Sequence, residues 1–266
     1  MELKLETQKM RAWIRDGVGW MEYNNPARRN AVSLEMWQAI GDIMGRFEQD
    51  PDVRVAVMRG AGGKAFVSGA DISEFDAKRG NAKQMASYGA ASARGSKALG
   101  TFSKPLIACI EGYCIGGGLA AALNADVRFA TPDSLFGIPA AKLGLGYGYE
   151  GLAKLSRQVG PTAARDILLS ARFLDAAEAL RIGLINFIEE RDAIRDAVAG
   201  YADRVAANAP LTLKAAKAAV DAWERGGRKE DLENVRRLVE ACFDSDDYRE
   251  GRRAFAEKRT PQFDGR

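Results

Sequence analysis

The sequence predicts an α/β protein whose C-terminal part is entirely helical. Up to about residue 190, short apolar segments typical of strands alternate with segments of helical periodicity, which is the rhythm of an α/β fold. Beyond that point the strand-like segments stop and several helical segments follow. We therefore expect a core over residues 1–191 and a helical region over residues 192–266. With 266 residues and 47% hydrophobic content, the chain can bury a full core.

The first elements are a pair of strands, a helix and a third strand. Residues 10–23 are predicted to form two strands around the turn at Asp16-Gly17. Ser33 can cap the next helix, because its hydroxyl can accept a hydrogen bond from an N–H of the first turn. That helix should bury a stripe of apolar residues at helical spacing: Met36, Trp37, Ile40, Ile43, Met44 and Phe47. Residues 53–58 follow as a strand.

A later strand leads through glycines into a helix. Residues 105–111 have the composition of a strand, and the Ala- and Leu-rich residues 119–125 that follow Gly116-Gly117-Gly118 favour a helix. In the C-terminal region, Asn208-Ala209-Pro210 and Gly226-Gly227 separate the predicted helices. One of these helices has an apolar stripe that could pack on its own core or on neighbouring subunits: Leu232, Val235, Leu238, Val239 and Cys242.

Composition excludes several functional classes. The 39 basic and 36 acidic residues give a net charge of +3, which is too even to suggest a nucleic-acid partner. No apolar run approaches the roughly 20 residues of a membrane span, and residues 1–10 do not resemble a signal peptide. We therefore expect a cytoplasmic protein with no membrane partner. The three cysteines are too few and too scattered for a zinc site or a disulfide framework.

The chain contains no histidine. This excludes Ser-His-Asp and Cys-His triads, histidine-ligated zinc and histidine general bases. Proton transfer must then use Asp, Glu, Tyr, Lys, Cys, a bound water or the substrate itself.

Two segments have the composition of ligand-binding turns. In residues 64–72, small side chains follow a strand and would allow a ligand to approach the backbone N–H groups. In the second segment, Gly116-Gly117-Gly118 opens a helix, where the first N–H groups have no intrahelical partner. Taken alone, each segment is more readily explained by a tight turn or by close packing. Facing each other, the two would form an oxyanion hole.

Together, in this order and spacing, the motifs of the chain resemble those of the crotonase superfamily, the enoyl-CoA hydratase/isomerase family. The resemblance covers nearly the whole length. Its motifs are Asn25-Pro26-Ala27-Arg28-Arg29-Asn30-Ala31, the segment 65–72, Gly112 to Gly118, Asn124-Ala125-Asp126, Phe136-Gly137-Ile138-Pro139, residues 176–185 and residues 250–259.

The resemblance implies a spiral of ββα turns, a C-terminal helical region that trimerises, and a hexamer of two trimers. It implies a coenzyme A (CoA) thioester as substrate and no further cofactor. The family's oxyanion hole carries over onto the N–H groups of Ser68 and Gly117. Arg29 corresponds to a position near the CoA phosphates, while Phe255 and Lys258 correspond to positions that reach the adenine of CoA in a neighbouring subunit.

The full set of substrate-binding positions implied by the resemblance is Arg29, Ala65, Phe66, Ser68, Gly69, Ala70, Asp71, Ile72, Gly116, Gly117, Ala120, Pro139, Ala140, Phe255 and Lys258.

The chain departs from the family at the two residues that move protons. Hydratases of the family use a glutamate two residues after the glycine triplet and another directly after the F-G-x-P motif; this chain has Ala120 and Ala140 there. Alanine cannot transfer a proton, so ordinary hydration is not expected. Isomerisation through the second glutamate is not expected either.

Tyr147 and Glu150 are the candidate replacements. Tyr147 falls where methylmalonyl-CoA decarboxylases of the superfamily have a tyrosine near the substrate carboxylate, although it could equally be a wall of the acyl pocket. Glu150 could transfer protons or could merely be a solvated charge at a helix start. Three hypotheses remain open. They are a hydratase- or isomerase-like enzyme that stabilises an acyl-CoA enolate, a malonyl-type decarboxylase, and a non-catalytic acyl-CoA binding protein.

Overall fold

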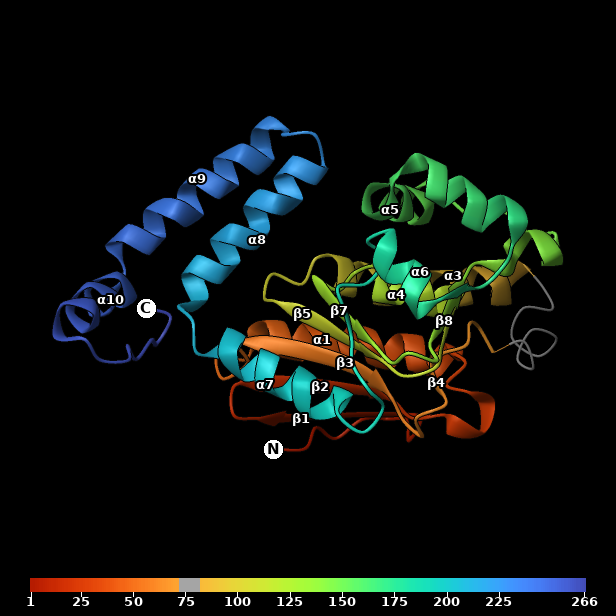
Figure 1. Ribbon diagram of the computed structural model, residues 1–266, viewed down its shortest axis with the longest axis horizontal. Helices are drawn as coiled ribbons and strands as arrows, with labels where there is room; N and C mark the ends of the chain where they lie inside the picture. The colour runs from red at the N-terminus through yellow and green to blue at the C-terminus, as the bar shows by residue number, and fades with distance from the viewer. Residues whose placement is uncertain (72–81) are drawn as a thin grey trace.

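The computed structural model describes residues 1–71 and 82–266, with side chains at every described position except 82–86 and 150. Two β-sheets lie at its centre, with helices around them and a helical extension at the C-terminal end (Figure 1). Among the described residues, no helix combines the length and the hydrophobicity that a membrane span requires.

The larger sheet begins with the predicted strand pair. Strands β1 and β2 pair antiparallel around Asp16-Gly17, where both residues have positive φ, and the remaining strands run parallel to β2. The strands of this sheet, in spatial order, are β1 (Met10–Arg15), β2 (Val18–Tyr23), β3 (Val55–Gly60), β5 (Leu106–Ile110), β7 (Val127–Ala130) and β10 (Phe187–Ile188).

Three of the four strands in the smaller sheet directly follow a strand of the larger sheet along the chain. Its strands are β4 (Ala65–Val67), β6 (Tyr113–Ile115), β8 (Leu135–Gly137) and β9 (Leu174–Asp175). The chain thus passes from β3 to β4, from β5 to β6 and from β7 to β8, changing sheet each time before a helical segment. This repetition is the predicted ββα spiral, and the α/β fold class is confirmed.

Helices cover both faces of the larger sheet. Because side chains alternate along a strand, Ala56 and Met58 join the main core with α1 (Leu34–Gln49), whereas Val55 and Val57 face α7 (Ile194–Ala206). The Ser33 hydroxyl caps α1 by accepting from the Met36 N–H at 3.4 Å, as predicted. The helices between the strands are α3 (Ala82–Gly100), α4 (Gly117–Ala122), α5 (Tyr149–Ser170) and α6 (Ala176–Arg181).

The C-terminal helices fall into two groups. Helix α7 packs on the larger sheet and shares a core with it. The predicted boundary at residue 191 therefore separates the sheet from a helix that packs on it. The helices α8 (Pro210–Glu224), α9 (Lys229–Asp244) and α10 (Asp246–Glu257) stand away from the sheets (Figure 1). Pro210 begins α8, and Gly226-Gly227 separates α8 from α9, as the sequence predicted.

Candidate functional site

The loop before α1 is fixed to the start of the smaller sheet by one buried asparagine. The Nδ2 of Asn30 donates to the carbonyl oxygens of Ala61 and Ala65, at 3.0 and 2.7 Å, and its Oδ1 accepts from the Asn25 N–H at 2.9 Å. Gly60 must be glycine here, because a Cβ would lie 2.2 Å from the Ala65 oxygen. This loop places Arg29 beside the smaller sheet.

The two predicted ligand-binding turns lie next to each other. They follow β4 and β6, which are adjacent parallel strands, so their carboxyl ends meet at the same edge. A Cβ built on Gly116 would lie 4.0 Å from the Cα of Gly69. One built on Gly118 would lie 2.2 Å from the Val67 oxygen, so only glycine lets α4 approach β4 this closely.

The N–H of Ser68 is not available as an oxyanion donor, and this part of the prediction is wrong. It donates to the Arg29 carbonyl at 3.1 Å, and the Ser68 hydroxyl lies 3.4 Å from the Arg28 carbonyl. A ligand could use this amide only by breaking a backbone hydrogen bond. The bond holds the Arg29 loop against the end of β4.

In this turn the N–H groups of Gly69 and Ala70 donate to no backbone acceptor among the described residues, and that of Ala70 points away from Val32. Val32 pairs in parallel with Ala70: the Val32 N–H donates to Gly69 at 2.8 Å, and the Asp71 N–H donates to Val32 at 3.0 Å. Because successive peptide groups alternate in direction, the Ala70 N–H points to the side opposite Val32. Among the described residues, no backbone acceptor is bonded to it.

Gly117 supplies the second amide. It is the first residue of α4, preceded by Gly116 with φ of 56°, and the Gly116 N–H donates to Gly137 at 2.8 Å. Within the described part of the chain, the Gly117 N–H has no backbone partner, as expected in the first turn of a helix. The amides of Ala70 and Gly117 thus lie on the two adjacent turns.

Tyr147 lies beside the two turns. Its hydroxyl would be 3.5 Å from a Cβ on Gly116, and its ring packs against the main core. Burial raises the pKa of Tyr147 above its ordinary value, so the phenol is neutral and can donate a proton or a hydrogen bond. Ala120, in α4, and Ala140, in the 3₁₀ helix η3 (Pro139–Leu143), are both half-buried.

The remaining predicted positions on this side divide into three groups. The side chains of Ala65 and Phe66 are buried in β4, where Phe66 contacts the ring of Tyr23, so only their backbone atoms could contact a ligand. Pro139 begins η3 and is half-buried. Ile72 and the side chain of Glu150 lie outside the described residues.

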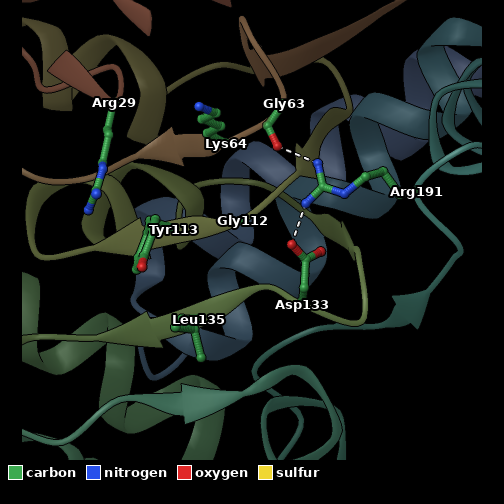
Figure 2. Close-up of a pocket in the computed structure, with 8 residues that line it drawn as sticks. All are labelled: Arg29, Gly63, Lys64, Gly112, Tyr113, Asp133, Leu135 and Arg191. Atoms are coloured by element: carbon green, nitrogen blue, oxygen red, sulfur yellow. Dashed lines mark hydrogen bonds and ion pairs between the residues drawn. The ribbon is translucent and has the colours of Figure 1, made fainter. Parts of the chain in front are cut away.

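A cationic pocket lies at the other end of these strands, where β4 and β6 begin (Figure 2). It has a volume of about 310 Å³ and is lined by Arg29, Gly63, Lys64, Gly112, Tyr113, Asp133, Leu135 and Arg191. The Arg29 guanidinium lies 5.0 Å from the centre of the Tyr113 ring, while Arg191 is bonded to Asp133 and to the Gly63 carbonyl. Lys64 is exposed at the pocket.

The resemblance assigned Arg29 to the CoA phosphates, but the sequence did not single out Lys64 or Arg191 as residues of this pocket. Lys64 was detectable, since it directly precedes β4 and the predicted ligand-binding turn. Arg191 was not, because its place in the pocket depends on β10 pairing with β7. The pocket lies where β3, β5, β7 and β10 end, and the carboxyl ends of parallel strands are where open α/β sheets bind ligands.

Phe255 and Lys258 lie far from these turns. Phe255 is 87% exposed on α10, and Lys258 is the residue that ends this helix. Figure 1 places α10 at the outer end of the C-terminal helices, away from β4 and α4. Any contact of these two residues with a ligand at the turns must therefore come from another subunit.

Comparison with known proteins identifies relatives across nearly the whole chain. The family model for enoyl-CoA hydratase/isomerase matches residues 14–266. A short-chain-enoyl-CoA hydratase of Clostridium acetobutylicum is 32% identical over 236 residues, covering 89% of this chain and 90% of that protein. An (E)-benzylidenesuccinyl-CoA hydratase of Thauera aromatica is 32% identical over 252 residues, covering 95% and 97%. A crystal structure of an enoyl-CoA hydratase/carnithine racemase from Magnetospirillum magneticum matches with a TM-score of 0.90 and 35% identity, covering 98% and 97%.

Proposed function

The chain belongs to the enoyl-CoA hydratase/isomerase family of the crotonase superfamily, and we propose that it stabilises the enolate of an acyl-CoA thioester between the amides of Ala70 and Gly117. The adjacency of the two turns is the observation that carries this proposal. Two N–H donors aimed at one point can bind the thioester oxygen more strongly as it gains negative charge. Removing one such donor typically costs about 3–4 kcal/mol.

The cationic pocket is the proposed site for the CoA phosphates. Lys64 and Ala70 stand at opposite ends of β4 and its turn, so at most ~20 Å of extended chain separates them. An extended thioester lying along β4 could then present its acyl end to the amides and its phosphates to Arg29 and Lys64. Arginine and lysine both form charge-assisted hydrogen bonds with phosphate.

Tyr147 is the proposed proton donor to the enolate. An enolate must take a proton on carbon, and the described residues beside Gly116 include this neutral phenol. Ala120 and Ala140 offer no proton. The hydratase- or isomerase-like activity that the family suggests would then need Tyr147, Glu150 or water in place of the glutamates.

A malonyl-type decarboxylase is the second candidate, because this chemistry needs no base. The bond between the α-carbon and the carboxylate breaks, its electron pair forms the enolate, and carbon dioxide leaves. The Tyr147 hydroxyl protonates the α-carbon and regains a proton from water. A non-catalytic acyl-CoA binder remains the third candidate. Incubation with crotonyl-CoA and methylmalonyl-CoA, with mass spectrometry of the products, distinguishes the three.

Loss of the Tyr147 hydroxyl should slow turnover without weakening binding. We expect Tyr147→Phe to lower the turnover rate by roughly 10²–10⁴-fold, the usual contribution of a positioned acid. Burial raises the pKa of Tyr147, so the phenol stays protonated at every pH below the ordinary tyrosine pKa of about 10. Its contribution to the rate is lost only as the pH rises through the raised pKa. The measurement is kcat between neutral and alkaline pH, for whichever of the two thioesters the protein converts. Tyr149→Phe, 81% exposed, is the matched control, and equal rates for both variants would remove Tyr147 from the mechanism.

CoA should bind whether or not the protein is a catalyst. We expect calorimetry to show affinity that falls with added salt, since phosphate contacts are screened. Arg29→Gln and Lys64→Gln should each weaken CoA binding roughly 10–100-fold. Arg15→Gln should not, because Arg15 lies at the end of β1, outside the pocket, with its side chain 79% exposed. The absence of binding of any acyl-CoA at millimolar concentration would end this proposal.

The C-terminal helices are the proposed subunit contact, giving a trimer or hexamer. Several large apolar side chains on α8, α9 and α10 are exposed in the single chain: Val220, Trp223, Leu232, Val239, Phe243 and Phe255. An exposed apolar surface of this kind typically marks an interface. We expect light scattering to give a multiple of 28.8 kDa and Trp223→Glu to shift the protein toward the monomer. A monomeric mass across a wide concentration range would contradict this.

A further inference from the structure

Among the described residues, the largest side chain that is almost completely buried is a cation, Arg128. It lies on β7 and is 2% exposed. A buried charge is costly unless hydrogen bonds satisfy it, and a methionine would fill a similar volume more cheaply. Packing alone therefore does not account for an arginine at this position.

The partners of Arg128 are backbone carbonyls. Its Nε donates to Leu184 at 2.7 Å and its Nη1 donates to Ala125 at 2.5 Å. Within the described part of the chain, no carboxylate lies within ion-pair distance of the guanidinium. Two carbonyls from separate segments thus share one rigid planar cation.

Ala125 marks the end of the helical segment that starts at Gly117. Beyond α4, the Asn124 N–H donates to Ala121 and the Ala125 N–H donates to Ala122, each at 3.0 Å, so helical turns continue to Ala125. The Arg128 contact ties the far end of this segment to the loop that carries Leu184. Close packing of Gly118 on Val67 fixes the near end. The direction of the Gly117 N–H depends on both.

We propose that Arg128 is a positioning residue, which holds the end of the α4 segment so that the Gly117 N–H points at the thioester oxygen. It touches neither substrate nor reacting atoms. The inference rests on the proposed function, because an aligned Gly117 amide matters only if it binds that oxygen. A planar guanidinium that is hydrogen-bonded to two carbonyl groups restricts rotation and sliding of a short helix better than apolar contacts do, because apolar contacts are not directional.

The test measures polarisation of a bound thioester. Cinnamoyl-CoA absorbs in the ultraviolet, and hydrogen bonds to its thioester oxygen shift this absorption to longer wavelength. We expect a red shift on binding to the wild-type protein, and loss of most of it in Arg128→Met at saturating ligand. Phe47→Leu in α1, which disturbs a fully buried side chain elsewhere, should lower thermal stability while keeping the shift.

Each outcome decides between a positioning and a merely structural role. A folded Arg128→Met protein with reduced stability and the full wild-type shift would overturn the inference alone. A wild-type complex without any shift would overturn both the inference and the oxyanion hole of the proposed function. If Arg128→Met does not fold, Arg128→Gln gives the same test: it is neutral and too short to reach both carbonyls, so a full shift in it also overturns the inference.

Discussion

Replacement of Gly118 with alanine should reduce any enolate-forming activity by about 10²–10³-fold, the cost of losing one oxyanion donor. The new Cβ would lie 2.2 Å from the Val67 oxygen and 2.7 Å from its Cβ. Neither atom can yield, because Val67 belongs to β4 and is fully buried. Helix α4 must therefore move away from β4, and the Gly117 amide moves with it. Overpacking should also cost about 1–3 kcal/mol of stability.

The control for this prediction is Gly89→Ala in α3. A Cβ at Gly89 meets nothing within 4 Å, and alanine is favoured over glycine in a helix by about 1 kcal/mol. Activity and thermal stability should then be at least those of the parent protein. The decisive comparison is kcat at saturating thioester for both variants, each checked by thermal melting. A folded Gly118→Ala enzyme with unchanged kcat would show that the Gly117 amide does not stabilise the enolate.

Much of the fold follows from local signals in the sequence. The Ser33 cap, the turn at Asp16-Gly17 and the break at Pro210 each depend on neighbouring residues alone, and each is present in the structure. The division of strands between two sheets was not visible in composition. It depends on which strands pair across long stretches of chain, and only the resemblance to a known family predicted it.

The oxyanion donors show where sequence reasoning reaches its limit. Composition marked the whole turn from Ser68 to Asp71, because small residues there allow close approach of a ligand. The choice among its amides depends on which of them are already bonded, since N–H groups alternate in direction along an extended chain. The pairing of Val32 with Ala70 and the bond from Ser68 to Arg29 decide this, and both are long-range.

The alanines at positions 120 and 140 should leave the protein with little or no hydratase activity. Ala120 lies in the first turns of α4 and Ala140 lies in η3, both half-buried in the part of the chain that also carries Tyr147. A positioned acid or base contributes roughly 10²–10⁴-fold to a rate. With neither glutamate present, we expect crotonyl-CoA hydration to be very weak or absent, even with both amides in place. Loss of absorbance of the conjugated thioester measures this rate.

Introducing Ala120→Glu and Ala140→Glu together should then raise the hydration rate. Each single change should help less, because the acid and the base act as a unit. Ala120→Glu combined with Ala141→Glu is the matched control, since Ala141 is the exposed neighbour in the same short helix and the added charge is the same. Robust hydration by the unmodified protein, insensitive to Tyr147→Phe and to Glu150→Gln, would show that other groups carry the protons. If instead hydration is present and collapses in Glu150→Gln, that carboxylate has replaced the missing pair, because one group then serves in turn as base toward water and as acid toward the enolate.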